Sequence, residues 1–298
     1  MKTSGYSFLT DEQVEQFLTQ GFVVIKNAFS REQAAHLSRD VWTRLGYNPE
    51  DKATWAKNRI HMPTLSSVLV QELAPRAYGA ICELCGGEER LTSARWGDGF
   101  IVNVGDESHT TSWEPPSASV PGWHKDGDFF RHFLDSPEQG LLTIVLWSDV
   151  LPTGGATFVA ADSVPVVAKH LAAHPEGIRP DGFDFQELVA QCSQFLEATG
   201  EAGDVYLMHP YLLHASSKNA LRLPRLITNP PVHLKEPMDF NRPDGNYSLV
   251  EAAVLRGLGV ESFDFVPTSP RERIIPERER MQVKMREEEK ARLEASNA

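Results

Sequence analysis

The sequence predicts a mainly β fold, a sandwich or barrel, with helices flanking it. From Phe100 onward, short apolar runs are separated by glycine and proline turn signals, a texture that differs from alternating strand-helix-strand units. Before residue 90, the chain instead carries helix-capping signals followed by apolar stripes at helical spacing. No Gly-x-Gly-x-x-Gly or Walker pattern follows an apolar run, which excludes the usual nucleotide-binding folds.

Composition excludes several classes of protein. The 298 residues are 41% hydrophobic and 23% charged, a balance that fills a core and excludes wholesale disorder. The apolar runs are too short for a membrane-spanning helix, and the formal net charge of −12 argues against a general nucleic-acid binder. No secretory signal is visible at the start, and three cysteines cannot form a disulfide framework. We therefore expect a cytoplasmic protein.

The N-terminal part of the chain, residues 10–90, is expected to be mostly helical. Capping boxes at Thr10 and Ser30 predict two helix starts, since a glutamine stands three residues after each hydroxyl. Between these helices, the β-branched run Phe22–Ile25 predicts a short strand. A third helical region is expected within Leu65–Leu84.

The β core is expected over about residues 95–232. Its predicted strands lie in the apolar runs Phe100–Val104, Trp123–Phe130, Leu141–Trp147, Ala156–Ala160, Asp204–Met208 and Leu226–Thr228. The segment Gly105–Pro121 is long, polar and contains proline, which is typical of a lid or binding loop.

We expect one domain over residues 1–240, followed by a C-terminal extension over residues 241–298. A helix with densely mixed charge is expected from about residue 271. Its apolar residues form only a thin stripe, which favours a solvated helix. A contact within a homodimer is the alternative for this helix.

Two His-x-acid triplets occur, and with ten histidines and 41 acidic residues chance alone predicts about one or two. His174-Pro175-Glu176 lies in a proline and glycine turn, where the two side chains have no reason to converge. His124 and Asp126 lie in a predicted strand, where positions two apart project to the same face and Lys125 points away. Together they supply two of the three ligands of a 2-His-1-carboxylate iron site.

A third ligand can come from the segment Gly203–His214, which offers His209 and His214. His209 directly follows a predicted strand and could be a structural histidine. His214 is followed by Ser216 and, in the next apolar run, by Arg225. The planar fork of an arginine binds a carboxylate through two hydrogen bonds, as an acidic cosubstrate would require.

These motifs together resemble the phytanoyl-CoA dioxygenase (PhyH) family of Fe(II)- and 2-oxoglutarate-dependent oxygenases. The similarity extends from Asp11 to about Val232, with Gly203–His214 and the arginine after it as the most specific part. The other residues that carry it are Asp11–Ile25, Trp123–Asp126, Leu141–Trp147, Gly154, Gly155, Ser216, Asn219 and Arg225. The stretch Ala160–Ser163 departs from the family's usual turn, which borders the substrate side.

The resemblance implies a double-stranded β-helix core, a cupin-like jelly roll. It implies that the catalytic iron ligands are His124, Asp126 and His214. It implies that 2-oxoglutarate is bound by Arg225, Ser216 and Trp147, with Arg225 on its distal carboxylate. His209 matches a position that is not a ligand.

The implied reaction uses Fe(II), 2-oxoglutarate and dioxygen to oxidise a small organic molecule and releases succinate and CO2. We expect the substrate to belong to specialised metabolism. Hydroxylation is the expected outcome, and a carboxylate at Asp126 argues against halogenation, because related halogenases have a small apolar residue there. Desaturation and ring closure share the same oxidant and stay open. Two other classes remain: a zinc hydrolase on the same barrel, and a non-catalytic binding protein. We expect no nucleic-acid or membrane partner.

Overall fold

The computed structural model describes residues 5–296, and two antiparallel sheets form its centre. The larger sheet has, within these residues, the strand order β1 (Phe22–Ile25), β9 (Val205–Met208), β6 (Leu141–Leu146), β11 (Arg225–Thr228), β5 (Ile101–Asn103) and β2 (Arg59–His61), with β12 (Pro231–Val232) paired to β6. The smaller sheet has the order β10 (His214–Ser216), β7 (Thr157–Ala160) and β8 (Phe195–Ala198). A separate ribbon pairs β3 (Ser67–Leu69) with β4 (Arg95–Gly97).

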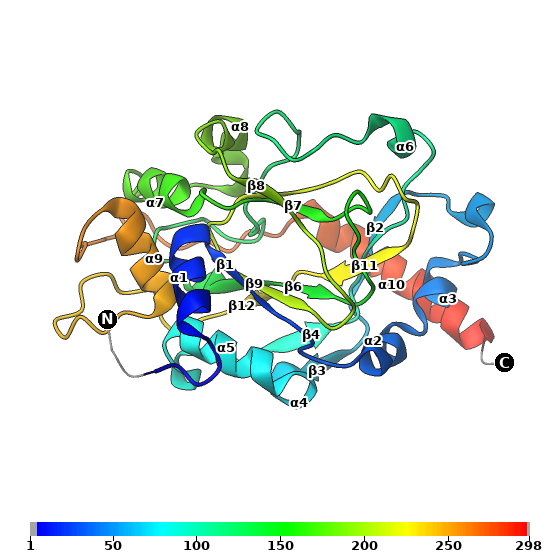
Figure 1. Ribbon diagram of the computed structural model, residues 1–298, viewed down its shortest axis with the longest axis horizontal. Helices are drawn as coiled ribbons and strands as arrows, with labels where there is room; N and C mark the ends of the chain where they lie inside the picture. The colour runs from blue at the N-terminus through cyan, green and yellow to red at the C-terminus, as the bar shows by residue number, and fades with distance from the viewer. Residues whose placement is uncertain (1–4, 297–298) are drawn as a thin grey trace.

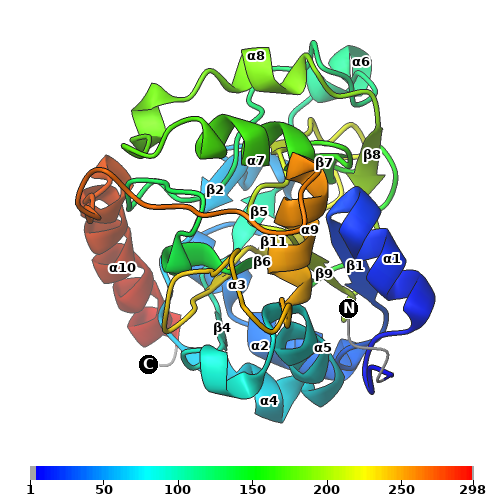
Figure 2. The same ribbon diagram turned by 90° about the vertical axis from the view of Figure 1, so that its left-hand side faces the viewer.

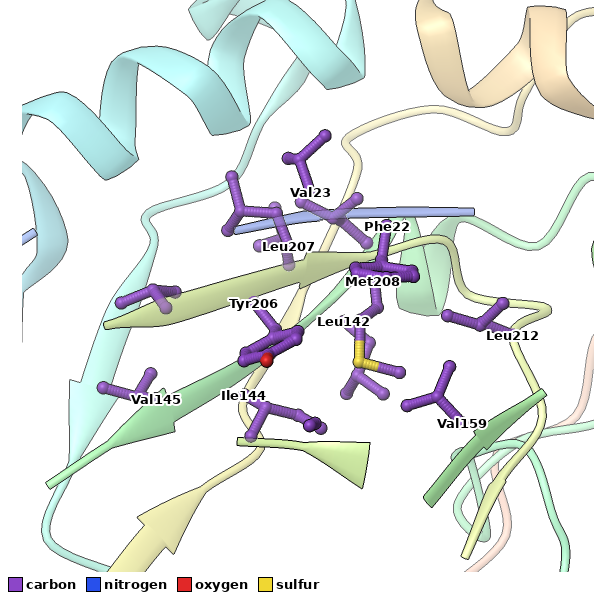
Figure 3. Packing of buried hydrophobic residues seen from close by; sticks show 14 of the residues in the cluster. Phe22, Val23, Leu142, Ile144, Val145, Val159, Tyr206, Leu207, Met208 and Leu212 are labelled. Carbon is purple, nitrogen blue, oxygen red and sulfur yellow. The ribbon is translucent and has the colours of Figure 1, made fainter. Parts of the chain in front are cut away.

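The two sheets belong to a double-stranded β-helix, as predicted. The smaller sheet lies over one face of the larger sheet, and α4 and α5 lie over the other (Figure 1). All six residues of β6 are buried, since this strand is covered on both faces. Figure 3 shows Leu142 and Met208 on the side of Val159, whereas Leu207 projects to the opposite face. The core therefore continues through the larger sheet.

Ten α-helices and four 3-10 helices surround the sheets within residues 5–296. The α-helices are α1 (Asp11–Gln20), α2 (Arg31–Ser38), α3 (Val41–Leu45), α4 (Val70–Leu73), α5 (Pro75–Cys85), α6 (His109–Ser112), α7 (Val164–Ala172), α8 (Phe185–Val189), α9 (Leu249–Leu258) and α10 (Glu277–Ser296). The 3-10 helices are Lys52–Thr54, Glu88–Arg90, Pro137–Gln139 and Pro180–Gly182.

Both predicted capping boxes begin helices. The side chains of Thr10 and Ser30 accept hydrogen bonds from the backbone amides three residues on. The glutamine side chains at those positions accept hydrogen bonds from the backbone amides of Thr10 and Ser30. The third helical region is divided: β3 precedes α4, and α5 begins at Pro75, a residue favoured in the first turn. The N-terminal part also supplies β1 and β2, which are the two edges of the larger sheet.

The predicted strand Trp123–Phe130 is wrong. The segment forms only two isolated bridges, at His124 and Phe130, and is otherwise a loop. Gly127 has φ +121°, a conformation that residues with a Cβ rarely adopt, and a Cβ there would lie 2.5 Å from the His132 ring. The chain therefore bends directly after Asp126 and cannot continue as a strand.

The C-terminal residues pack against the rest of the chain. Helix α9 contacts α1, α5 and α7, and α10 contacts α3 (Figure 2). On α10 the Glu289 side chain is 2% exposed and lies 2.8 Å from the Arg44 guanidinium of α3. Arg44 also donates to the backbone carbonyls of Pro63 and Asp98. The expected solvated helix is thus anchored through a buried ion pair. Within residues 5–296, no helix is both long and apolar enough to cross a membrane.

Replacing Arg44 should destabilise the fold strongly, because the change leaves the Glu289 carboxylate buried without its partner. We expect Arg44→Met to lower the free energy of unfolding by about 3–5 kcal/mol, measured by chemical denaturation. The double variant with Glu289→Met should recover part of this loss. Lys284→Met removes an exposed pair on the same helix and should change stability little. Equal stability of Arg44→Met and Lys284→Met would show that the buried pair does not anchor α10.

Candidate metal centre

The loop after Gly122 and strand β10 meet through a pair of backbone hydrogen bonds. His124 N donates to His214 O at 3.0 Å, and His214 N donates to His124 O at 2.9 Å. Residues that exchange both bonds stand directly opposite each other, with their side chains on the same side. The two imidazole centroids are accordingly 4.4 Å apart. Two residues ninety positions apart in the chain are thereby placed as one unit.

Both imidazoles present the same nitrogen to the space between them. His124 Nδ1 lies 2.8 Å from the Gly122 carbonyl, and His214 Nδ1 lies 3.0 Å from the Leu212 carbonyl. A carbonyl can only accept, so each Nδ1 carries the proton. The Nε2 lone pairs remain free for a metal ion, in the arrangement usual for metal-binding histidines.

Asp126 completes the group. Its Oδ1 atom lies 3.5 Å from Nε2 of each histidine, and the three ligand atoms all lie within 4.8 Å of one another. Ligands at about 2.1 Å from one ion lie about 3 Å apart when adjacent, so little movement is needed. The other carboxylate oxygen, Oδ2, accepts a hydrogen bond of 2.7 Å from Asn229 Nδ2. Within residues 5–296, this is the one such group that the structure contains.

The electrostatics of the group favour an anionic Asp126. Burial alone would raise the pKa of this carboxyl, but His214 and His124 hold it well below its ordinary value. Burial would also lower the pKa of His124, yet its hydrogen bond with Asp126 raises it overall. A carboxylate with two adjoining imidazoles suits a divalent cation of the first transition row.

Lys125, between His124 and Asp126, is buried. Its Nζ lies 2.6 Å from His132 Nδ1 and also contacts the Phe130 and Tyr211 rings. The other ring nitrogen of His132 lies 2.7 Å from the Gly127 carbonyl. Burial lowers the pKa of Lys125 to about 7. These contacts fix the bend of the loop that carries Asp126.

Arg225 on β11 is buried, being 2% exposed, and two of its guanidinium nitrogens, Nε and Nη2, have no hydrogen-bond partner. Burial, with the charge of Arg59 adding to it, lowers the pKa of Arg225 to about 9. Such donors are rarely left unpaired inside a protein, so the site is suited to an anionic ligand.

Arg59, on β2, is a second guanidinium that sequence reasoning missed. Arg59 and Arg225 both stand opposite Asn103 in the sheet, one on each neighbouring strand, so the three side chains share a face. Arg59 donates a hydrogen bond to the Ser216 hydroxyl, which connects this predicted site residue to the group. No motif marks Arg59 in the sequence; the only signal is its alternation with His61 on a short strand.

Of the predicted site residues, His124 and Asp126 line the cavity beside the candidate metal centre, whereas His214, Ser216, Arg225 and Trp147 are not among its lining residues. The Trp147 ring packs against Phe29 and Phe100 in the core. Its Nε1 donates to the Thr228 hydroxyl at 2.9 Å, and Thr228 does line that cavity. Trp147 therefore contacts the site through Thr228.

The cavity beside the metal centre has a volume of about 590 Å³. Its lining residues come in part from the loop 124–129, the candidate metal-binding loop, from His61 at the end of β2 and from Thr228 at the end of β11. The side chains that line it include His61, Met62, Asp128, Phe129, Gln139, Phe185, Asn229, Arg278 and Gln282. A space of this size accommodates a small organic molecule.

His209 lies apart from the metal centre. It is fully buried, its Nε2 lies 3.2 Å from the Val250 carbonyl, and its Nδ1 accepts from the Tyr211 amide. Burial lowers its pKa to about 3. His174 and Glu176 do contact each other, at 2.8 Å, but on the surface and without a third ligand.

A jelly roll that combines a His-x-Asp and His group with a buried, unpaired arginine defines the class of non-haem iron, 2-oxoglutarate-dependent enzymes. The sequence matches the family described as "Phytanoyl-CoA dioxygenase (PhyH)" over residues 17–222. The chain belongs to this family, and its cofactor and cosubstrate are Fe(II) and 2-oxoglutarate. No curated protein matches the sequence.

Several solved structures are similar to this chain. The α-ketoglutarate-dependent carbocyclase SnoK from nogalamycin biosynthesis has 18% identity and a TM-score of 0.45, covering 78% of this chain and 87% of its own. HygX from Streptomyces hygroscopicus, with nickel and 2-oxoglutarate bound, has 17% identity and a TM-score of 0.45, covering 76% and 88%. EctD from S. alaskensis, with 2-oxoglutarate and 5-hydroxyectoine, has 17% identity and a TM-score of 0.40, covering 78% and 77%.

Removing the hydrogen bond to the Asp126 carboxylate should weaken metal binding. We expect Asn229→Ala to bind nickel about 10- to 100-fold more weakly than the unchanged protein, measured by isothermal titration, because Oδ2 loses its donor and the carboxylate is no longer oriented. Asn241→Ala, at an exposed asparagine that bonds Asp264, is the matched control. Unchanged nickel affinity in Asn229→Ala would show that Asp126 needs no such orientation or is not a ligand.

Proposed function

We propose that this protein is an Fe(II)- and 2-oxoglutarate-dependent dioxygenase that hydroxylates a small organic molecule in the cytoplasm and releases succinate and CO2. His124, Asp126 and His214 are its iron ligands in this proposal. The observation that carries it is the buried, unpaired guanidinium of Arg225 on the same face of the sheet as cavity-lining residues. A metal triad alone is compatible with several reactions, whereas the triad with an anion site behind it favours 2-oxoglutarate.

The donor set fits ferrous iron. Two imidazole nitrogens and one carboxylate oxygen would hold the ion, and this is the donor set that non-haem ferrous iron takes in oxygenases. When bound, the iron would supply the activation of dioxygen, driven by the oxidative decarboxylation of 2-oxoglutarate.

The protein's own residues would position the cosubstrate. Arg225 has two free donors in a planar fork, which suits the distal carboxylate of 2-oxoglutarate. Arg59 adds a second positive charge on the same face and donates a hydrogen bond to the Ser216 hydroxyl. Burial strengthens the interaction that Arg225 can make with an anion, because little water competes for its guanidinium.

The protein would also keep the ligands rigid. The two histidines are held by carbonyls at Nδ1, Asp126 is held by Asn229, and the loop is held by the Lys125 contacts. Each donor atom therefore keeps its orientation through the reaction.

Two features bear on the type of oxidation. Asp126 lies in contact distance of both histidines, so a carboxylate occupies the position that a halide would need. This supports oxygenation over halogenation. The cavity lined by His124 and Asp126 has room for a small molecule, and a carbon of a substrate bound there would lie near the iron, which would supply the oxidising chemistry.

A zinc hydrolase is the second candidate, since the same three donors bind zinc. In that reading Arg225 has no evident ligand, although it is buried with two unpaired nitrogens. The unpaired arginine therefore favours the oxygenase.

Anaerobic addition of Fe(II) and 2-oxoglutarate tests the proposal. We expect a weak visible charge-transfer band, followed by succinate release when air is admitted. His214→Ala should lose both, because it removes one iron ligand. Neither band nor succinate in the unchanged protein, together with hydrolytic activity in zinc, would favour the hydrolase instead.

Replacing the buried arginine should act on the cosubstrate. Arg225→Gln is expected to raise the KM for 2-oxoglutarate about 100-fold in a succinate-release assay, because two charge-assisted hydrogen bonds are lost. Nickel affinity should stay near that of the unchanged protein, since Arg225 is not a ligand. Arg256→Gln, at a surface arginine paired with Glu15, is the control. An unchanged KM in Arg225→Gln would remove Arg225 from the cosubstrate site.

A further inference from the structure

The C-terminal part of the chain runs beside the metal-binding loop. Ile274 N donates to Phe129 O at 2.8 Å, and Arg131 N donates to Glu272 O at 3.0 Å. The Glu272 carboxylate also pairs with Arg131 and Arg179. Residues just before α10 are therefore joined to the segment that directly follows Asp126.

Helix α10 is fixed at its far end as well. Glu289 forms the buried pair with Arg44, and Arg292 donates to the Arg44 carbonyl at 2.6 Å. In Figures 1 and 2 the red helix lies along one side of the molecule, close to α3. Because both ends are held, the first turns of α10 keep a defined position beside the cavity.

These first turns supply two polar side chains to the cavity. Arg278 and Gln282 are four residues apart and so share one face of the helix. Both line the cavity that His124 and Asp126 also line, whereas Met281 and Val283, on other faces, are exposed. The C-terminal extension therefore forms part of the wall that a substrate would contact.

Arg278 is paired with Asp128, two residues after Asp126. Its Nη2 lies 2.6 Å from Asp128 Oδ1, and the side chains are 46% and 44% exposed. Exposed pairs of this kind contribute little stability, so an incoming anion can replace Asp128 at small cost. The guanidinium already has the fork geometry that a carboxylate or phosphate needs.

The charged side chains that line the cavity favour Arg278 as the group that an anion meets. Besides the histidines they are Lys125, Asp126, Asp128 and Arg278. Lys125 is buried against His132, and Asp126 lies between the two histidines. Arg278, half exposed and paired only with the exposed Asp128 carboxylate, is therefore the cation that an entering anionic group can reach.

We propose that Arg278 is a specificity-determining residue, which binds an anionic group of the substrate, a carboxylate or a phosphate, in exchange for its pair with Asp128. This inference rests on the proposed function and adds the class of substrate to it. The substrate is then a small molecule with an oxidisable carbon near the iron and an anionic group at the mouth of the cavity.

Titration of the nickel- and 2-oxoglutarate-loaded protein with inorganic phosphate and, separately, with acetate tests this proposal. Nickel and 2-oxoglutarate fill the metal centre and the Arg225 site, so that the binding of added anions can be assigned to Arg278. We expect Asp128→Asn to bind at least one of the two anions about tenfold more tightly than the unchanged protein, since Arg278 is then unpaired. The double variant with Arg278→Gln should lose this gain. The anion that shows the larger gain distinguishes a phosphate from a carboxylate group.

Arg280→Gln, on the same helix but away from the cavity, is the matched control and should keep the gain when combined with Asp128→Asn. Equal anion affinity in Asp128→Asn with and without Arg278→Gln, or no anion binding in any variant, would overturn the proposal. Nickel and 2-oxoglutarate binding is measured first in each variant. If nickel or 2-oxoglutarate does not bind, that result counts against the proposed function. The anion titration is then repeated on the metal-free protein, where the anion affinities of Arg278→Gln and Arg280→Gln are compared.

Discussion

The pair of backbone hydrogen bonds between His124 and His214 is the constraint on which the site depends. It joins a loop to the edge strand of the smaller sheet, and it sets the distance and the common side of two imidazoles. Asp126 follows two residues later and reaches both rings from the same loop. The rest of the fold keeps these two segments in register: β10 is paired to β7, and the loop is bent at Gly127 and held by Lys125.

The larger sheet positions the two arginines of the candidate anion site. Its central strands are buried on both faces, which gives a rigid platform, and its β11, β5 and β2 strands carry a row of polar side chains across one face. Arg225 and Arg59 flank Asn103 in this row. Arg225 is buried with two unpaired nitrogens, whereas Arg59 is exposed and hydrogen-bonded to Ser216. A buried guanidinium without a partner is unfavourable, so this face of the sheet is suited to an anionic ligand. The candidate metal centre thus comes from a loop and the edge of the smaller sheet, and the candidate anion site comes from the larger sheet.

The fold class and the grouping of His124, Asp126 and His214 could be predicted from the sequence, although one step of the reasoning was wrong. His124 and Asp126 do converge, but from a bend and not from a strand, since positions two apart can also meet in a loop that a glycine redirects. Asn229, Arg59 and Arg278 could not be predicted in the same way. Their roles depend on contacts across 103, 157 and 150 residues, and no local pattern encodes such contacts.

Iron-edge anomalous diffraction from anaerobic crystals containing Fe(II) and 2-oxoglutarate tests the central claim most directly. The account predicts one iron peak at about 2.1 Å from Nε2 of His124, Oδ1 of Asp126 and Nε2 of His214, with a carboxylate of 2-oxoglutarate against the Arg225 guanidinium. An iron peak elsewhere, or 2-oxoglutarate bound away from Arg225, would contradict it.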